Sequence, residues 1–137
     1  MEEKKEQNKI EEIARTNFLL WNDALLTRDF EKVVELYAED ATFLPTMSSE
    51  FKKGRSDAKE YFEHFLKKCP ISEIVQDDIQ SLGSDCYLHS GMYNFEVGSD
   101  DNKQTVEARF SFVWKIDQQE GEVWRIIHHH SSIKPKG

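Results

Sequence analysis

The sequence predicts a single α+β domain in which a curved antiparallel sheet wraps around one long helix. The length of 137 residues suits one domain with its own core. Apolar residues recur at helical spacing in the first half of the chain, whereas turn residues divide the second half into strand-like segments. Helices followed by antiparallel strands are typical of an α+β layout.

The first predicted helix is long and begins at Ile10. Its apolar positions recur every three or four residues and so share one face. They are Ile10, Ile13, Ala14, Phe18, Trp21 and Leu25. Residues 1–9 are almost all charged or amide residues, so we expect a frayed helix start or a charged tether there. One domain over residues 10–137 would follow.

The second predicted helix is short and follows a break at residues 27–28. Asp29 is a good N-cap, because its carboxylate can accept a hydrogen bond from a free N–H of the first turn. The apolar stripe of this helix consists of Phe30, Val33, Val34 and Tyr37. A short strand over residues 41–44 follows, and Pro45 closes it.

A hairpin return over residues 47–54 leads into the third predicted helix. Ser56 can cap this helix, and Asp57 suits its first turn because the positive end of the helix dipole stabilises a carboxylate. The inward side chains would be Tyr61, Phe62, Phe65 and Leu66. Pro70 prevents the helix from continuing.

Four strand segments follow Pro70, separated by turn residues at 83–85, 98–102 and 117–121. Alternation is clearest over residues 105–116. One face there carries Val106, Ala108, Phe110, Phe112, Trp114 and Ile116. The opposite face carries Glu107, Arg109, Ser111 and Lys115. We expect one face of the sheet to meet the helices and the outer face to meet water or another subunit.

The composition argues against several classes of partner. The chain has 26 acidic and 18 basic residues, a net charge of −8, which disfavours nucleic acid and anionic membranes. No apolar run approaches the roughly 20 residues needed to cross a bilayer, and the N-terminus is charged. Cys69 and Cys86 form no CxxC pattern, so free thiols and a cytoplasmic location are expected, although a disulfide between them stays open.

The most conspicuous polar feature is the run His128, His129 and His130 near the end of the last strand. Alternation directs His128 and His130 to one face and His129 to the other. A metal site needs further ligands, and the neighbouring sequence supplies no carboxylate or cysteine, so we expect no metal. Histidines that bond across strands, or that line a polar pocket or an interface, are the simpler interpretation.

Other residues could contribute to a ligand pocket. Arg109 lies in the middle of a strand, and a buried arginine needs a carboxylate partner or an anionic ligand. Glu107, two residues away on the same face, is the ordinary partner, and a carboxylate-bearing ligand is the functional alternative. His89 and Tyr93 share a strand face, and with Trp21 they are candidates for a pocket wall, although such aromatic stripes are more often core.

No catalytic set can be assembled from spacing alone. The chain contains no GxGxxG, GxxxxGK[ST], GxSxG or HExxH motif. Asp77 and Asp78 are adjacent, so on a strand they point to opposite faces, and we expect both to be solvated. We therefore predict no catalytic residue and no cofactor.

Three stretches between Trp21 and Pro135 carry a family resemblance. They are WNDALLTRDFEKVVELYAEDATFLPTMSSEFKKG, then YFEHFLKK, then HHHSSIKP. This pattern resembles the NTF2-like superfamily, and within it the association (hub) domain of calcium/calmodulin-dependent protein kinase II. The resemblance implies a conical fold with a strongly bent sheet around the first helix and two shorter helices. It further implies dimers that pair through their sheets, and rings built from such dimers.

The chain departs from its relatives at sites that matter for function. The kinase hub carries several pocket arginines where this chain has Gly91, Phe112 and Ser131. Related ketosteroid isomerases place a catalytic aspartate after a segment similar to YAEDATF. This chain has Leu44 and Pro45 there, and neither can move a proton.

The resemblance thus implies a non-catalytic self-association domain whose small pocket would take an acidic or polar ligand. A second interpretation stays open, in which the cone serves a small-molecule-binding protein or an isomerase- or dehydratase-like enzyme of the SnoaL and ketosteroid isomerase group. The candidate pocket residues are Trp21, His89, Tyr93, Arg109, His128, His129 and His130.

Overall fold

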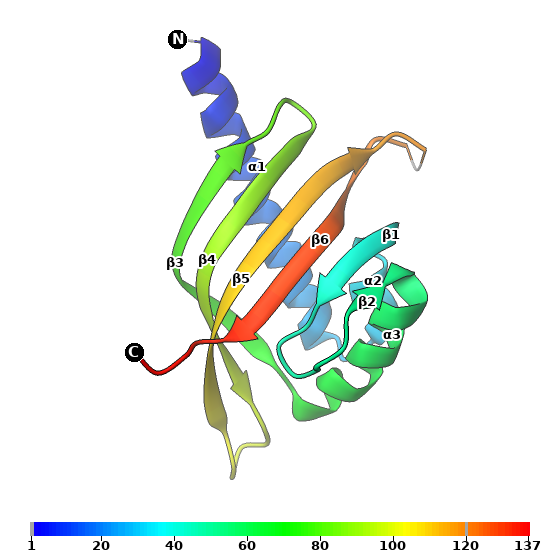
Figure 1. The fold of residues 1–137 in the computed structure, drawn as a ribbon, viewed down its shortest axis with the longest axis vertical. Coiled ribbons are helices and arrows are strands. Elements are labelled where there is room, and N and C mark those ends of the chain that lie inside the picture. The colour runs from blue at the N-terminus through cyan, green and yellow to red at the C-terminus, as the bar shows by residue number, and fades with distance from the viewer. Residues whose placement is uncertain (1, 120) are drawn as a thin grey trace.

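A strongly curved six-stranded sheet holds the long helix α1 against its inner face in the computed structural model, which describes residues 2–119 and 121–137 (Figure 1). The predicted α+β class is confirmed. The helices are α1 (Glu2–Leu26), α2 (Phe30–Val34), α3 (Gly54–Phe65) and the 3₁₀ helix η1 (Leu66–Lys68). The strands are β1 (Tyr37–Leu44), β2 (Lys52–Lys53), β3 (Ile71–Ser81), β4 (Cys86–Val97), β5 (Gln104–Asp117) and β6 (Val123–Ile133).

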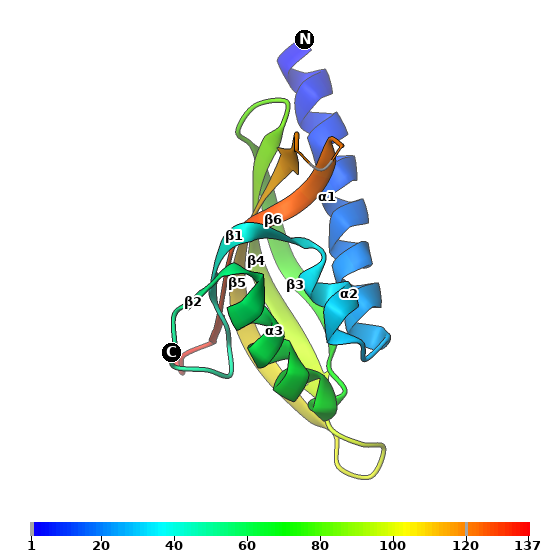
Figure 2. The same cartoon turned by 90° about the vertical axis from the view of Figure 1, so that its right-hand side faces the viewer.

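Helix α1 crosses the sheet on one side only (Figures 1 and 2). Trp21 and Leu25 are fully buried on the sheet-facing side of α1, as the helical spacing predicts. The charged segment expected as a frayed start or a tether is helical over its described residues 2–9. Gln7 ties it to the sheet, because its side chain bonds to the carbonyl of Ile79 at 2.7 Å and to the N–H of Ser81 at 3.2 Å. Among the described residues, no helix is both long and apolar enough to cross a membrane.

Helix α2 is shorter than its apolar stripe predicts. Asp29 caps it as expected, accepting a hydrogen bond from the Glu31 N–H at 3.0 Å. The helix ends at Val34, however, and Tyr37 begins β1 instead of lying on the helical stripe. Tertiary packing explains the difference, because the side chain of Tyr37 is fully buried and its hydroxyl bonds inside the sheet.

Helix α3 begins two residues before the predicted cap. The residue before its first turn is Lys53, not Ser56, and no side chain of that cap residue bonds to the helix. Asp57 performs a related role, since its carboxylate accepts a hydrogen bond from the Lys53 N–H at 3.0 Å. The expected hairpin return is present as β2, which pairs antiparallel with β1.

The sheet is mixed rather than antiparallel throughout. Its order is β2-β1-β6-β5-β4-β3, and β1 runs parallel to β6 while the other neighbours are antiparallel. The alternation predicted for β5 is confirmed, because its even-numbered side chains face the core and its odd-numbered ones do not. The turn expected at residues 117–121 includes residue 120, which lies outside the described residues.

A bulge in β3 requires a glycine opposite it in β4. The β3–β4 register shifts between Ile74 and Gln76, and Gly91 pairs with Asp77 just beyond the shift. A Cβ atom on Gly91 would lie 2.0 Å from the carbonyl oxygen of Gln76 and 2.7 Å from the Cα of Asp77. The neighbouring backbone therefore leaves no room for a side chain at this position.

We expect Gly91→Ala to lower the free energy of unfolding by about 1–3 kcal/mol, because the methyl group forces two paired strands apart. Urea denaturation followed by circular dichroism measures the change. Ser90→Ala is the matched control, since Ser90 is the adjacent residue on the opposite face of β4, and it should stay near wild type. Equal stability of Gly91→Ala and wild type would contradict the close approach.

Candidate functional site

The inner face of the sheet carries a polar cluster centred on His129, which is 2% exposed. Its Nδ1 lies 2.9 Å from the Tyr37 hydroxyl, and its Nε2 lies 3.2 Å from the Tyr93 hydroxyl. Trp21 Nε1 donates to Tyr37 at 3.2 Å, and the Tyr93 hydroxyl donates to Ser131 Oγ at 2.6 Å. Both ring nitrogens are therefore satisfied by side chains from other elements.

The donors of this cluster form a chain with one direction. The indole of Trp21 can only donate, so the Tyr37 hydroxyl accepts from it and has its own proton available for Nδ1 of His129. Because Tyr93 gives its proton to Ser131, Nε2 of His129 carries the hydrogen that Tyr93 accepts. The network thus assigns the neutral Nε2–H tautomer to His129.

Burial keeps His129 neutral. Loss of water lowers the pKa of His129 well below its ordinary value, and His128 and His130 lower it further. The ring stacks on Phe112 and Phe43, with centroids 3.9 Å and 4.9 Å away. The cavity left among these side chains is about 10 Å³, about enough for one water molecule. Trp21, Tyr93 and His129 therefore do meet, but in a packed core.

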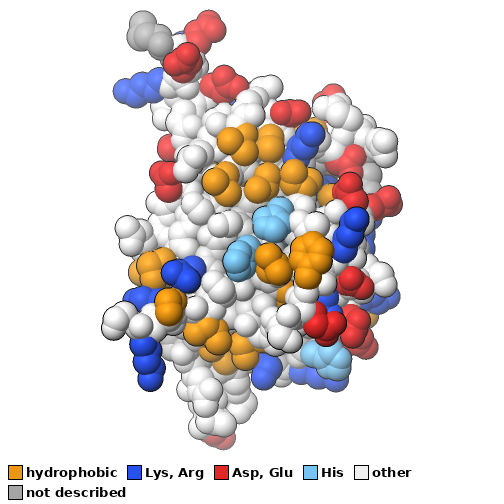
Figure 3. Space-filling view, in the orientation of Figure 1, with side chains coloured by type: hydrophobic (Ala, Val, Ile, Leu, Met, Phe, Trp, Pro, Cys, Tyr) orange, Lys and Arg blue, Asp and Glu red, His pale blue; other side chains and the backbone are white. Residues whose placement is uncertain are grey.

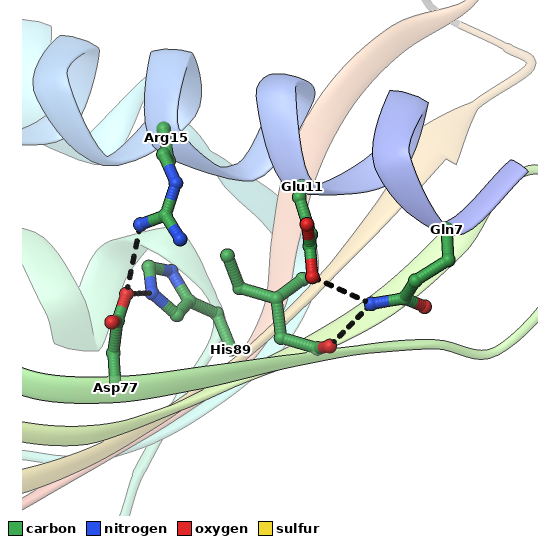
Figure 4. A network of polar contacts seen from close by, with 6 residues as sticks. Gln7, Glu11, Arg15, Asp77 and His89 are labelled. Atoms are coloured by element: carbon green, nitrogen blue, oxygen red, sulfur yellow. Dashed lines mark hydrogen bonds and ion pairs between the residues drawn. The ribbon is translucent and has the colours of Figure 1, made fainter. Parts of the chain in front are cut away.

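His89 belongs to a separate cluster between the sheet and α1 (Figure 4). Its side chain is 0% exposed, and Nε2 lies 2.8 Å from Asp77 Oδ2. The same carboxylate oxygen lies 3.2 Å from Nη1 of Arg15 on α1. Asp77 is thus an ion-pair and hydrogen-bond partner, and the expectation that it is simply solvated is wrong.

The surroundings of His89 also hold its ring neutral. Burial lowers the pKa of His89, and the hydrogen bond and charge of Asp77 oppose this shift. Its Nδ1 has no hydrogen-bond partner among the described residues. The rings of Phe18 and Phe110 meet it edge-on, so His89 sits in the aromatic core.

Arg109, His128 and His130 lie on the other side of the sheet. Arg109 is an odd-numbered residue of β5 and is exposed, so its side chain faces away from the interior. The prediction that Arg109 lines an interior pocket is therefore wrong. His128 is half-buried, and its Nδ1 lies 2.6 Å from Thr42 Oγ1 of β1. Burial lowers the pKa of His128, as does the nearby His130.

We name this side the outer sheet face and define it by the outward residues of β4, β5 and β6 in the middle of the sheet. These residues are Leu88, Ser90, Met92, Arg109, Ser111, Val113, His128 and His130. No described helix covers this face (Figure 1). Figure 3 shows histidine and hydrophobic side chains gathered at its centre, and most acidic side chains toward its margins.

A metal role for these histidines has no supporting geometry. Within residues 2–119 and 121–137, no three His, Cys, Asp or Glu side chains converge in a way that could hold a metal ion. His128 and His130 face outward while His129 faces inward, as the alternation predicts.

Several members of the clusters escaped the sequence-based selection. The sequence pattern placed Tyr37 on a helix and predicted that the Asp77 side chain is solvent-exposed. Ser131 and Thr46, whose hydroxyls bond to each other, lie in the stretches that carry the family resemblance but were not selected as pocket residues. A usable signal existed for Ser131, because it lies two residues after His129 and therefore shares its inward face.

Comparison with known proteins identifies the relatives of this chain. The sequence model of the calcium/calmodulin dependent protein kinase II association domain matches residues 9–135. A structure from Xanthomonas campestris, provisionally assigned as such a domain, shares 37% identity and has a TM-score of 0.85. The match covers 92% of this chain and 88% of that one.

Two further solved structures share the fold at low identity. The association domain of the Caenorhabditis elegans kinase has 20% identity and a TM-score of 0.73, covering 93% of this chain and 98% of its own. A Streptomyces avermitilis protein, provisionally assigned as an NTF2-like dehydratase, has 13% identity and a TM-score of 0.77, with coverages of 94% and 98%. Among curated proteins none matches the chain.

We expect Asp77→Ala to lower the free energy of unfolding by about 1–3 kcal/mol, because it leaves the buried His89 ring without its one described hydrogen-bond partner. Asp78→Ala is the matched control, since the neighbouring carboxylate is exposed, and a change within about 0.5 kcal/mol is expected. Urea denaturation at pH 7 compares the two. Similar losses for both variants would contradict the pairing.

The buried His129 should make stability depend on pH. Its folded-state pKa is lowered, so below pH 6.5 the unfolded chain binds a proton that the folded chain does not. The contribution is complete above about pH 6.5 and falls by up to about 1.4 kcal/mol for each pH unit below it. His129→Phe should reduce this slope between pH 6.5 and pH 5, measured by urea denaturation.

Phe112→Leu is the control for this slope, because it loosens the same cluster without removing a titratable group. It should be less stable than wild type and keep the wild-type pH dependence. If His129→Phe also keeps that dependence, His129 is not the group responsible.

Proposed function

The chain belongs to the calcium/calmodulin dependent protein kinase II association domain family, and on that premise we propose that it is a non-catalytic self-association domain. Its dimer would form through the outer sheet face. Rings built from such dimers are the larger assembly that we propose by analogy with the family. Membership in the family supports the oligomerisation role, and the surface of this chain supports the choice of face.

The observation that carries the proposal is the row structure of the outer sheet face. Leu88 pairs with Val113, and Val113 pairs with His128 across β4, β5 and β6. In the next row, Ser90 pairs with Ser111, and Ser111 pairs with His130. The apolar pair Leu88 and Val113 and the small pair Ser90 and Ser111 let a second sheet approach closely over β4 and β5. A broad uncovered face of this kind is typical of a protein interface.

The charges of the face also bear on contact between copies. Each chain carries a net charge of −8, so two copies repel each other at long range. The outward side chains of β5 and β6, however, include the basic Arg109, Lys115 and Arg125 as well as the acidic Glu107 and Asp117. This part of the surface therefore carries both signs of charge, which opposes contact between copies less than a uniformly acidic surface would.

The enzymatic alternative has less support in this chain. Its proposed anchor, Arg109, lies on the opposite side of the sheet from Trp21 and Tyr93. The interior holds a cavity of about 10 Å³, which is too small for a substrate. Without a shared chamber, the candidate polar residues form no catalytic constellation.

Light scattering on the purified protein tests the proposal. We expect wild type at micromolar concentration to have at least twice the chain mass of 16.1 kDa. Val113→Asp should shift the protein toward monomer, because it places a charge in the centre of the outer sheet face. The shift should be at least tenfold in the dimer dissociation constant, or about 1.4 kcal/mol.

Leu19→Asp is the matched control, because it also replaces a hydrophobic residue with an acid but lies on α1, where Leu19 is 60% exposed. This variant should retain the dimer. A monomeric wild type would overturn self-association altogether. A Val113→Asp protein that dimerises like wild type would overturn the choice of face.

A further inference from the structure

A second cavity lies outside the aromatic interior, between α3 and the loop that joins β1 to β2. Its volume is about 210 Å³, far larger than the space around His129. Met47, Tyr61 and Phe65 supply apolar surface to its wall, and Tyr61 and Phe65 separate it from the packed interior. The cavity is therefore large enough for a small organic molecule.

The distinctive group of this cavity is the ammonium of Lys52. The Lys52 side chain is only 7% exposed, and its strand position is fixed by pairing with Phe43 of β1. Its Nζ forms no hydrogen bond with a described residue, and the carboxylate of Glu50, 3.6 Å away, is its recorded ion-pair partner. Lys52 is one of the residues that line the cavity.

One further cationic group, Lys68, and one further carboxylate, Glu60, border the same space. His64 and Lys68 lie four residues apart at the end of α3 and in η1, so they project from the same side. Glu50, by contrast, is 71% exposed and belongs to a loop, so its carboxylate can give way to another carboxylate that takes its place at the buried Lys52. The present partner of Lys52 is thus replaceable, while Lys52 itself is held in place.

We propose that this cavity binds a small organic monocarboxylate with an apolar or aromatic body. The ligand carboxylate would replace that of Glu50 at Lys52 and accept hydrogen bonds from Nζ. The body of the ligand would contact Met47, Tyr61 and Phe65. Glu50 is then an internal competitor that occupies the carboxylate position in the free protein. No residue of the outer sheet face lines this cavity, so the proposal does not rest on the proposed self-association.

The probe for this proposal is benzoate, with benzamide as its neutral counterpart. Titration of the full ¹⁵N-labelled chain is followed by amide chemical shifts. Benzoate should give saturable shifts confined to residues 47–52 and 60–68, and benzamide should bind at least tenfold more weakly because it lacks the charge. Equal binding of both probes, or no saturable shifts with benzoate, would overturn the proposal. Inorganic phosphate binding at least as tightly as benzoate would overturn the organic class.

Two substitutions should move the benzoate affinity in opposite directions. Lys52→Met keeps the apolar stem and removes the charge, so binding should weaken about tenfold. Glu50→Gln removes the competitor, so binding should tighten several-fold. Lys59→Met, which removes an exposed lysine paired with Glu31, should leave the affinity unchanged.

The pair of variants keeps the test decisive. If Lys52→Met fails to fold, as judged by circular dichroism, the Glu50→Gln variant still distinguishes the outcomes. Tighter binding in Glu50→Gln but not in Lys59→Met supports the site. Unchanged or weaker binding in Glu50→Gln, or an equal change in Lys59→Met, overturns it.

Discussion

The architecture depends on the hydrogen bonds that both ring nitrogens of His129 make in the middle of the aromatic core. His129 bonds through one nitrogen to Tyr37 of β1 and through the other to Tyr93 of β4, while Trp21 of α1 joins through Tyr37. A buried imidazole without these partners would destabilise the fold, so helix and strands must meet in one arrangement. The same arrangement packs these side chains closely, which explains why the cavity beside His129 is only about 10 Å³.

Local patterns predict the elements of this fold better than its contacts between elements. The apolar spacing of α1 and the alternation of β5 depend on side-chain periodicity alone, and both are confirmed. Tyr37 was misplaced because its burial inside the sheet overrides its fit to a helical stripe. Asp77 was misplaced because its partner, His89, lies on another strand. Arg109 was predicted to lie in an interior pocket, although the alternation of β5 puts it on the face opposite Phe110 and Phe112.

The residues that distinguish this chain from the kinase hub also explain where its function lies. The resemblance places pocket arginines of the hub at Gly91, Phe112 and Ser131. Here Gly91 faces a bulge with no room for a side chain, Phe112 stacks on His129, and Ser131 ends the hydrogen-bond chain. At these three positions the interior is filled by packing and hydrogen bonds. Both proposed binding surfaces, the outer sheet face and the cavity beside α3, therefore lie outside this packed cluster.

Strand β6 joins two environments through consecutive residues. His129 faces the dry interior, while His128 and His130 face the opposite way. A shift of one residue in the register of β6 would exchange these positions, placing two imidazoles in the core and one outside. Both sides of the sheet together therefore disfavour a change of register at the three histidines. Three identical side chains thus occupy two unlike environments, and the register of β6 alone decides which imidazole is held neutral in the core.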